Sequence, residues 1–186
     1  MEALRSEGGG LMTPEVDKLY EEALAHLEAW RLDEAEEGLR KVIEMDPEHA
    51  RAFNKLGVIF ARRGDLRQAE DCFSQAVTLD DQLASVHSNL GNIYAERDWI
   101  DRAKASYERA LALDPGNPTA MHNLGVLYRK GGDIGRGVDL MKQATRSERN
   151  RLRDDTRRDP ESRRVVRIGL AILIVAVFVI FYLLNR

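Results

Sequence analysis

The 186-residue chain contains few of the groups from which active sites and metal centres are built. Its single cysteine, Cys72, excludes an internal disulfide and is compatible with a reducing compartment. No HxxxH or CxxC spacing occurs, and the GxGxxG, P-loop and GxSxG motifs are missing. We therefore predict that the protein is not an enzyme, holds no metal and needs no cofactor.

Long hydrophobic runs are also missing until the end of the chain. Residues Ile168–Leu184 then form an uninterrupted apolar run without a charge. As a helix such a run spans roughly 26 Å, near the lower limit for a bilayer core of about 30 Å. We expect a transmembrane tail anchor over 165–186. The alternative, a buried helix of the soluble part, leaves no polar face to meet water.

Arginines dominate the stretch before this run, although acids are mixed among them. The positive-inside rule places that side in the cytoplasm, and no export signal precedes the large N-terminal part. We predict a basic juxtamembrane stalk over 152–164, anionic lipid headgroups near Arg157–Arg167, and a single-pass protein with a cytoplasmic N-terminal domain. A nucleic-acid-binding arm is the weaker alternative, so we expect no nucleic-acid partner.

The N-terminal residues 1–15 read as a leader that is disordered. The codons of Glu7-Gly8-Gly9 can form a bacterial ribosome-binding sequence shortly before Met12. The start is therefore either Met1 or Met12, and the second choice favours a bacterial plasma membrane.

A 34-residue period runs through the rest of the chain. The sequences "LGVIF", "LGNIY" and "LGVLY" place Gly57, Gly91 and Gly125 at equal intervals. Other columns repeat with the same spacing, and we assign them to packing between helices: Ala69 and Ala103, Phe73 and Tyr107, Pro47 and Pro115. The repeating units are 16–49, 50–83, 84–117 and 118–151.

This pattern resembles the tetratricopeptide repeat (TPR), whose unit has the same length and consists of two helices. The resemblance implies an all-α fold: a TPR helical-hairpin solenoid, a right-handed superhelix, here followed by one C-terminal transmembrane helix. The first unit departs from the pattern at Glu22, and the fourth departs at Gly137 and lacks a closing proline.

Each residue column that recurs from unit to unit has an expected physical role within the repeat. The three glycines let the second helix of a unit approach the first, and Pro47 and Pro115 suit the start of the following unit. We expect Trp30 and Trp99, in the turns between helices, to pack against the protein. Cys72 reads as a small filler on a second helix rather than as a reactive thiol.

The resemblance also implies a concave groove lined by the first helix of every unit. Asn89 and Asn123 share a column, where an amide can pair with the backbone of an extended peptide. Cations in the groove suit an acidic segment or a free carboxylate. The two-carboxylate clamp of chaperone-binding relatives is incomplete at Val58 and Thr119. The candidate groove residues are Arg51, Asn54, Lys55, Arg62, Asn89, Asn92, His122, Asn123 and Lys130.

These observations favour a membrane-tethered adaptor or scaffold whose groove binds a peptide or helix of a cytosolic protein. Two alternatives stay open. One is an accessory or assembly subunit of a membrane enzyme or secretion complex, and the other is a tail-anchored organelle receptor resembling the mitochondrial fission adaptor. The groove residues can also be ordinary solvated helix faces.

Overall fold

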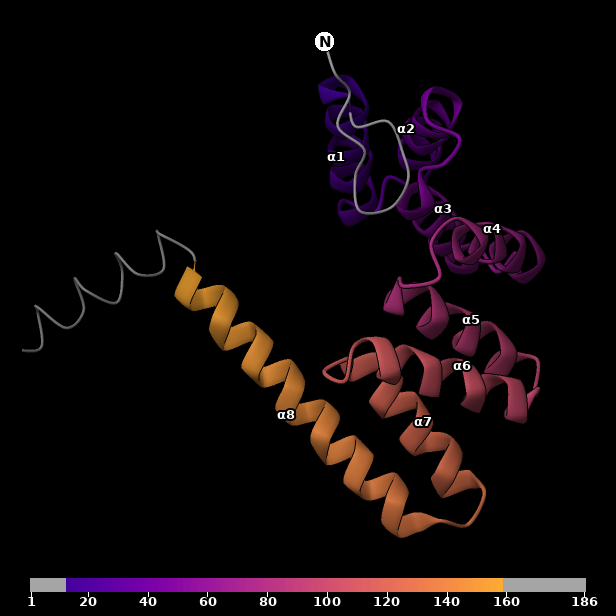
Figure 1. The fold of residues 1–186 in the computed structure, drawn as a ribbon, viewed down its shortest axis with the longest axis vertical. Coiled ribbons are helices and arrows are strands. Elements are labelled where there is room, and N and C mark those ends of the chain that lie inside the picture. Colours follow the sequence, from indigo (N-terminus) through magenta and orange to yellow (C-terminus); the bar gives the residue numbers. More distant parts are fainter. Residues whose placement is uncertain (1–12, 159–186) are drawn as a thin grey trace, which may run out of the picture. The chain divides into compact units, whose positions relative to one another are not determined.

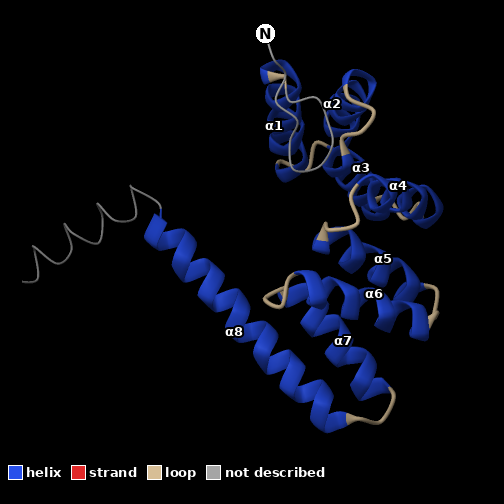
Figure 2. Ribbon diagram, viewed as in Figure 1, coloured by secondary structure: helices blue, strands red, loops and turns tan. Residues whose placement is uncertain are grey.

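The computed structural model describes residues 13–158, with side chains through residue 154. Figure 2 shows that this part of the chain is built from helices joined by short loops. The helices are α1 (Pro14–Glu28), α2 (Leu32–Met45), α3 (Ala50–Arg62), α4 (Leu66–Leu79), α5 (Ala84–Glu96), α6 (Ile100–Leu113), α7 (Pro118–Lys130) and α8 (Ile134–Arg158). Each 34-residue unit thus contains one helix pair, and the predicted all-α repeat fold is confirmed for this part.

The chain divides into two compact units, residues 1–144 and 145–186. The first contains α1 to α7 and the beginning of α8, which Figure 1 colours from indigo to orange. The described residues of the second unit continue α8 as one polar helix to Arg158.

Side chains from the preceding loops cap several of the helices. Thr13 accepts a hydrogen bond from the Val16 amide at 3.3 Å, and Asn117 accepts one from Ala120 at 3.0 Å. Each of these caps precedes a proline in the first helical turn, where a missing N–H costs nothing. The N-termini of α1 and α7 are therefore fixed by local sequence.

The glycine column sets the distance between the two helices of a unit. A Cβ atom added to Gly57 would lie 2.6 Å from the Phe73 ring, and one added to Gly91 would lie 2.5 Å from Tyr107. Neither separation is sterically possible, so the prediction that these glycines allow close approach is confirmed. In unit four, a Cβ added at Gly137 would lie 2.6 Å from the Gly125 carbonyl oxygen, which explains why this unit has glycine where the others have alanine.

The core follows the predicted columns along the array. Ala69, Phe73, Ala103 and Tyr107 are at most 1% exposed. Burial of such side chains contributes roughly 1.5–3 kcal/mol for each large residue and is the main force that holds the helix pairs together.

The turn within each helix pair requires a left-handed residue at one column. Gly64 and Gly132 have φ of +80° and +93° there, while Trp30 and Asp98 adopt +59° without being glycine. Trp30 is 70% exposed, and Trp99, which follows Asp98, is 42% exposed, so these tryptophans pack against the protein at its surface rather than in the core. Arginine guanidinium groups stack on both rings instead, because the turns project beyond the helical core.

The loops between units are shaped by aspartate rather than by proline. The Oδ1 atoms of Asp46, Asp80 and Asp114, again 34 residues apart, accept hydrogen bonds from the amides two residues later. Pro47 and Pro115 follow the first and third of these aspartates, are exposed, and lie before the helices rather than within them. The prediction that they pack between repeats is therefore corrected; Asp81 can replace the proline because Asp80 already forms the turn.

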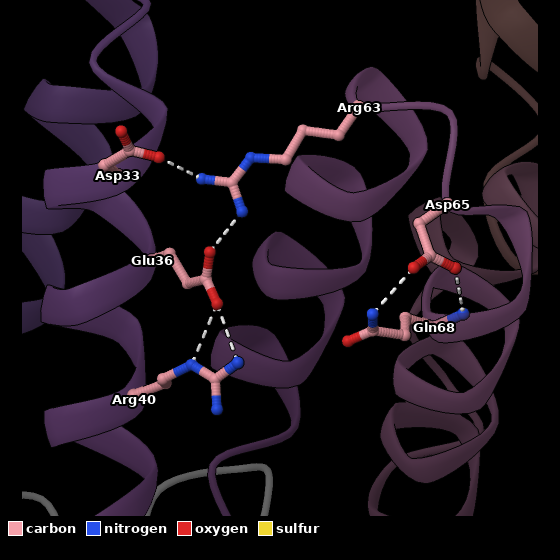
Figure 3. A network of polar contacts seen from close by, with 6 residues as sticks. All are labelled: Asp33, Glu36, Arg40, Arg63, Asp65 and Gln68. Atoms are coloured by element: carbon pink, nitrogen blue, oxygen red, sulfur yellow. Dashed lines mark hydrogen bonds and ion pairs between the residues drawn. The ribbon is translucent and has the colours of Figure 1, made fainter.

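Ion pairs connect the turns of neighbouring units. Figure 3 shows Arg63, at the end of α3, reaching Asp33 and Glu36 of α2, with Glu36 also bound by Arg40. Asp65 caps α4 through the Gln68 amide at 3.0 Å. Exposed ion pairs of this kind contribute little to the free energy of unfolding, but they hold the turn of one unit beside the turn of the next.

Several predictions fall outside the described residues. These are most of the leader, the end of the stalk, the lipid-contacting residues beyond Arg158, and the tail anchor with Ile168–Leu184. Among the helices of residues 13–158, none is both long and apolar enough to span a bilayer.

Candidate functional site

The first helices of the units, α1, α3, α5 and α7, form one continuous face. Contacts join α1 to α3, α3 to α5, and α5 to α7, so that consecutive first helices are neighbours although a second helix separates them in sequence. The groove candidates lie on this face because they occupy equivalent columns of the first helices. We call this face the groove.

Between units two and three, the groove contains a chain of amide and hydroxyl groups. Asn89 Nδ2 donates to Asn54 Oδ1 at 2.9 Å, and Asn54 Nδ2 donates to Ser85 Oγ at 3.1 Å. Asn54 is only 5% exposed, and both ends of its amide have a partner. Its position favours a structural role, whereas Asn89 keeps its carbonyl oxygen directed outside this chain of bonds.

Between units three and four, a tyrosine joins the amide network. Tyr107 Oη donates to Asn92 Oδ1 at 2.8 Å, and Asn123 Nδ2 donates to the same oxygen at 2.7 Å. Burial raises the pKa of Tyr107 to about 12, so its hydroxyl stays a hydrogen-bond donor at neutral pH. The two bonds occupy both lone pairs of Asn92 Oδ1, which leaves the Asn92 amide N–H groups and the Asn123 carbonyl oxygen for other partners.

A hollow of about 230 Å³ lies against this network. Its polar lining comes from Asn92, Asn123 and Lys130, and its apolar lining comes from Ala95, Ile100, Val126, Leu127 and the Tyr107 ring. We call it the 3/4 hollow, after the units that form it. An apolar cavity edged by a few directed polar groups is the usual form of a binding pocket.

A second hollow of about 400 Å³ adjoins the first. Val126 and Lys130 line both, and Arg129 and Ile134 complete the second. Ile134 is 63% exposed, which is unusual for a side chain of its size. The two hollows therefore form a continuous apolar surface with cations at its border.

The predicted groove cations differ in what they contact. Arg62 donates to the Leu27 carbonyl at 3.1 Å and lies 4.5 Å from the Trp30 ring centre, so the first turn holds it. Arg51 and Lys130 are exposed and Lys55 is half-buried, and none of these three forms an ion pair within the described residues. These three are the cations that a ligand in the groove can reach.

The structure brings only some of the candidates together. Asn92, Asn123 and Lys130 meet at the 3/4 hollow, whereas His122 is exposed on α7 and does not line the hollow. Sequence reasoning assigned Tyr107 to packing alone and missed its hydroxyl in the groove. The available signal was the exchange of Phe73 for Tyr107 within one column.

Other ionisable groups do not form a competing site. Burial raises the pKa of the Cys72 thiol to about 11, which keeps it protonated and poorly nucleophilic at neutral pH. In the described part of the chain, no group of three or more His, Cys, Asp or Glu side chains is placed to hold a metal ion.

Solved structures share this fold at low sequence identity. MamA matches 74% of this chain and 81% of its own at 24% identity, with a TM-score of 0.62. PilF of Pseudomonas aeruginosa matches 73% of this chain and 62% of its own at 24% identity, with a TM-score of 0.65. The first TPR domain of Spaghetti (RPAP3), bound to the HSP90 peptide SRMEEVD, matches 65% of this chain and 96% of its own at 22% identity, with a TM-score of 0.60.

Two family models match the sequence itself. Residues 20–84 match one described as tetratricopeptide repeat, and residues 91–132 match one described as TPR repeat. No curated protein matches the chain. The two models agree with the helix pairs of the structure, and the chain therefore contains tetratricopeptide repeats.

Proposed function

We propose that the protein is a membrane-tethered adaptor that binds a peptide or helix of a cytosolic partner in its groove. The observation that carries this proposal is the 3/4 hollow, where an apolar lining, two directed amides and a lysine without an ion pair converge. Folding alone does not require that such a group of side chains stays exposed to solvent. Groups of this kind serve recognition rather than catalysis, so the proposed protein is not an enzyme.

The structural relatives agree with a scaffold role. The RPAP3 domain is named as bound to a peptide with three acidic residues and an acidic C-terminus. For a similar ligand this chain would offer the cations Arg51, Lys55 and Lys130, although the two-carboxylate clamp of chaperone-binding relatives is incomplete here. An acidic or C-terminal peptide is therefore the ligand class we propose.

The tether remains a proposal based on sequence. The apolar run Ile168–Leu184 would cross a membrane, and the arginines of 157–167 would lie among anionic headgroups on the cytoplasmic side. The bacterial plasma membrane is the proposed location. A carbonate wash of native membranes tests this: the full chain should stay in the pellet and a chain ending at residue 164 should be released. Release of the full chain would contradict the tether.

Two related functions would use the same fold. An accessory subunit of a membrane enzyme or secretion complex would copurify with that enzyme in fixed stoichiometry. A tail-anchored organelle receptor, like the mitochondrial fission adaptor, would require a eukaryotic source.

Affinity purification from detergent-solubilised native membranes tests the groove. The full-length protein should retain a partner that the double variant Asn123→Ala, Lys130→Gln loses. The matched control, Lys142→Gln with Gln143→Ala, changes exposed residues of α8 in the same unit and should keep the partner. Equal recovery of partners by all three proteins would contradict groove binding.

A further inference from the structure

The C-terminal half of α8, the long orange helix of Figure 1, carries arginines at helical spacing. Arg146, Arg149 and Arg153 follow one another at intervals of three and four residues, and Arg157 continues the same register. Residues three and four apart share one face of an α-helix, so these four positions form one line along α8. We call this line the arginine stripe. The side chains of Arg146, Arg149 and Arg153 are exposed.

The acids of the same segment are not placed to neutralise the stripe. Glu148, Asp154 and Asp155 each lie three or four residues from Arg151, which falls on the opposite face of the helix. No Asp or Glu lies at those distances from the three exposed arginines of the stripe. Those three arginines also form no ion pair with any residue that the structure describes. The segment therefore has one face of mixed charge and one face of cations alone.

This arrangement works against the helix that carries it. Like charges three or four residues apart destabilise an α-helix, and the stripe contains such a pair at every step from Arg146 to Arg157. The surroundings of Arg151 show that the same segment can place acids beside an arginine. A face of unneutralised cations is stabilised when it meets negative charge outside the helix, so the stripe favours an anionic partner.

The chemistry of the face narrows the kind of anion. Guanidinium groups bind phosphate oxygens through paired N–H donors. The stripe extends over roughly 16 Å of helix, so it fits several phosphates in a row rather than one. Asn150 and Thr156, which fall between the arginines by register, are polar, and the face thus has no apolar side chain to insert into hydrocarbon. The expected contact is with phosphates at a surface.

The sequence after α8 favours a membrane as the source of these phosphates. The apolar run starts at Ile168, eleven residues after Arg157, and a chain of that length reaches at most roughly 40 Å. Where this run crosses the bilayer, as proposed above, the stripe stays within that distance of the headgroups. Such a tether raises the effective concentration of lipid phosphate, so that individually weak contacts add up.

We infer that the arginine stripe binds the anionic headgroups of the membrane that the tail enters, so that the C-terminal half of α8 lies along the bilayer surface. This inference rests on the tether of the proposed function. It adds a lipid-binding face on a folded helix, outside the groove and before the residues 157–167. It also makes the position of α8 depend on the anionic lipid content and on the salt concentration.

Arginine footprinting of the full-length protein tests this contact. The protein would be reconstituted in nanodiscs of phosphatidylcholine alone or of an equal mixture with phosphatidylglycerol, and then treated with phenylglyoxal. Mass spectrometry would follow the modification of each arginine. Arg149 and Arg153 should react about fivefold more slowly in the mixed discs, and high salt should remove the difference. Arg151, on the opposite face, should react at nearly the same rate in both.

Two variants with equal loss of charge separate the stripe from the rest of α8. Arg146→Gln with Arg153→Gln should remove most of the protection of Arg149, because the remaining arginines bind the surface more weakly. Arg151→Gln with Arg158→Gln removes the same charge from the opposite face and should leave that protection unchanged. Glutamine and arginine have similar helix propensity, and equal helical circular dichroism of the two variants would exclude loss of the helix.

The contact and the tether fail differently. Equal rates for Arg149 in the two kinds of disc, or equal protection of Arg149 and Arg151, would overturn the stripe contact while the tether stands. Protection by added polyglutamate or duplex DNA, but not by phosphatidylglycerol, would assign the stripe to an acidic protein or a nucleic acid and overturn the lipid contact. Release of the full chain by the carbonate wash would overturn the tether and the stripe contact together.

Discussion

Two junctions of this molecule share one backbone arrangement and differ in chemistry. Within unit two, Phe73 packs on Gly57, and Val58 is partly buried against the core. Within unit three, Tyr107 packs on Gly91 in the same way, but its hydroxyl binds Asn92, which also accepts a hydrogen bond from Asn123 of unit four. Helix spacing is thus set by one glycine column, and recognition is set by a few polar atoms that can change without moving a helix. Fold and specificity are therefore encoded in different columns of the repeat.

The largest expected effect comes from replacing the glycines against which the two aromatic rings pack. Gly57→Ala and Gly91→Ala should each lower the free energy of unfolding by about 3 kcal/mol, because a Cβ has no room beside the aromatic ring. Gly135→Ala is the matched control: no atom lies within 4 Å of its added Cβ, so helix propensity should make it neutral or slightly stabilising. Urea denaturation measures all three, and a neutral Gly91→Ala would refute the packing account.

The next largest effect comes from giving unit two the tyrosine hydroxyl that unit three has. Phe73→Tyr should destabilise by about 1–2 kcal/mol, because Phe73 is 1% exposed and the new hydroxyl would face Val58 without a partner. Adding Val58→Asn should recover part of this loss by supplying the acceptor that Asn92 provides in unit three. Denaturant midpoints of the single and double variants check the coupling, which would be absent if the columns were not equivalent.

The reverse exchange should cost less. Tyr107→Phe removes one hydrogen bond but leaves Asn92 Oδ1 bound by Asn123, so we expect a loss of about 0.5–1.5 kcal/mol. The same urea titration measures it. A loss larger than that of Phe73→Tyr would contradict the view that the polar network serves the groove more than the fold.

The smallest effect concerns the junction between units one and two. His49 Nδ1 accepts a hydrogen bond from the Ala52 amide at 3.1 Å, and burial lowers the pKa of His49. A folded-state pKa below the usual 6.5 means that the unfolded chain binds more protons just below pH 6.5, so stability contributed by neutral His49 is lost as the pH falls. We expect a cost of about 0.5–1 kcal/mol at pH 5.5.

The matched variant for that junction is His49→Asn, which copies the cap that Asn117 provides in unit three. Its unfolding free energy, compared between pH 7.5 and 5.5, should fall less than that of the unaltered protein. An identical fall in both proteins would assign the pH dependence to other groups.

The sequence was sufficient to predict the helix pairs and their period, since glycine, alanine and aromatic residues recur at helical spacing. It was not sufficient for features that depend on side-chain direction. Trp30 was expected to pack against the protein, but the spacing could not show that its left-handed turn leaves the ring largely exposed, with Arg62 as its contact. Arg62 was expected in the groove, but the Leu27 carbonyl holds it. The hydrogen bond from Tyr107 to Asn92 decides which amide atoms stay available for a ligand. Residue spacing in the sequence does not predict that bond.

Site-specific photo-crosslinking in intact cells tests the central claim most directly. A photoreactive amino acid would replace His122, which is exposed on α7 and precedes Asn123 in the sequence, or Gln143, which is exposed on α8 of the same unit. We predict a defined protein adduct from position 122, weakened when Lys130→Gln is added, and little or none from position 143. Adducts that form from position 143 and not from position 122 would contradict recognition through the groove.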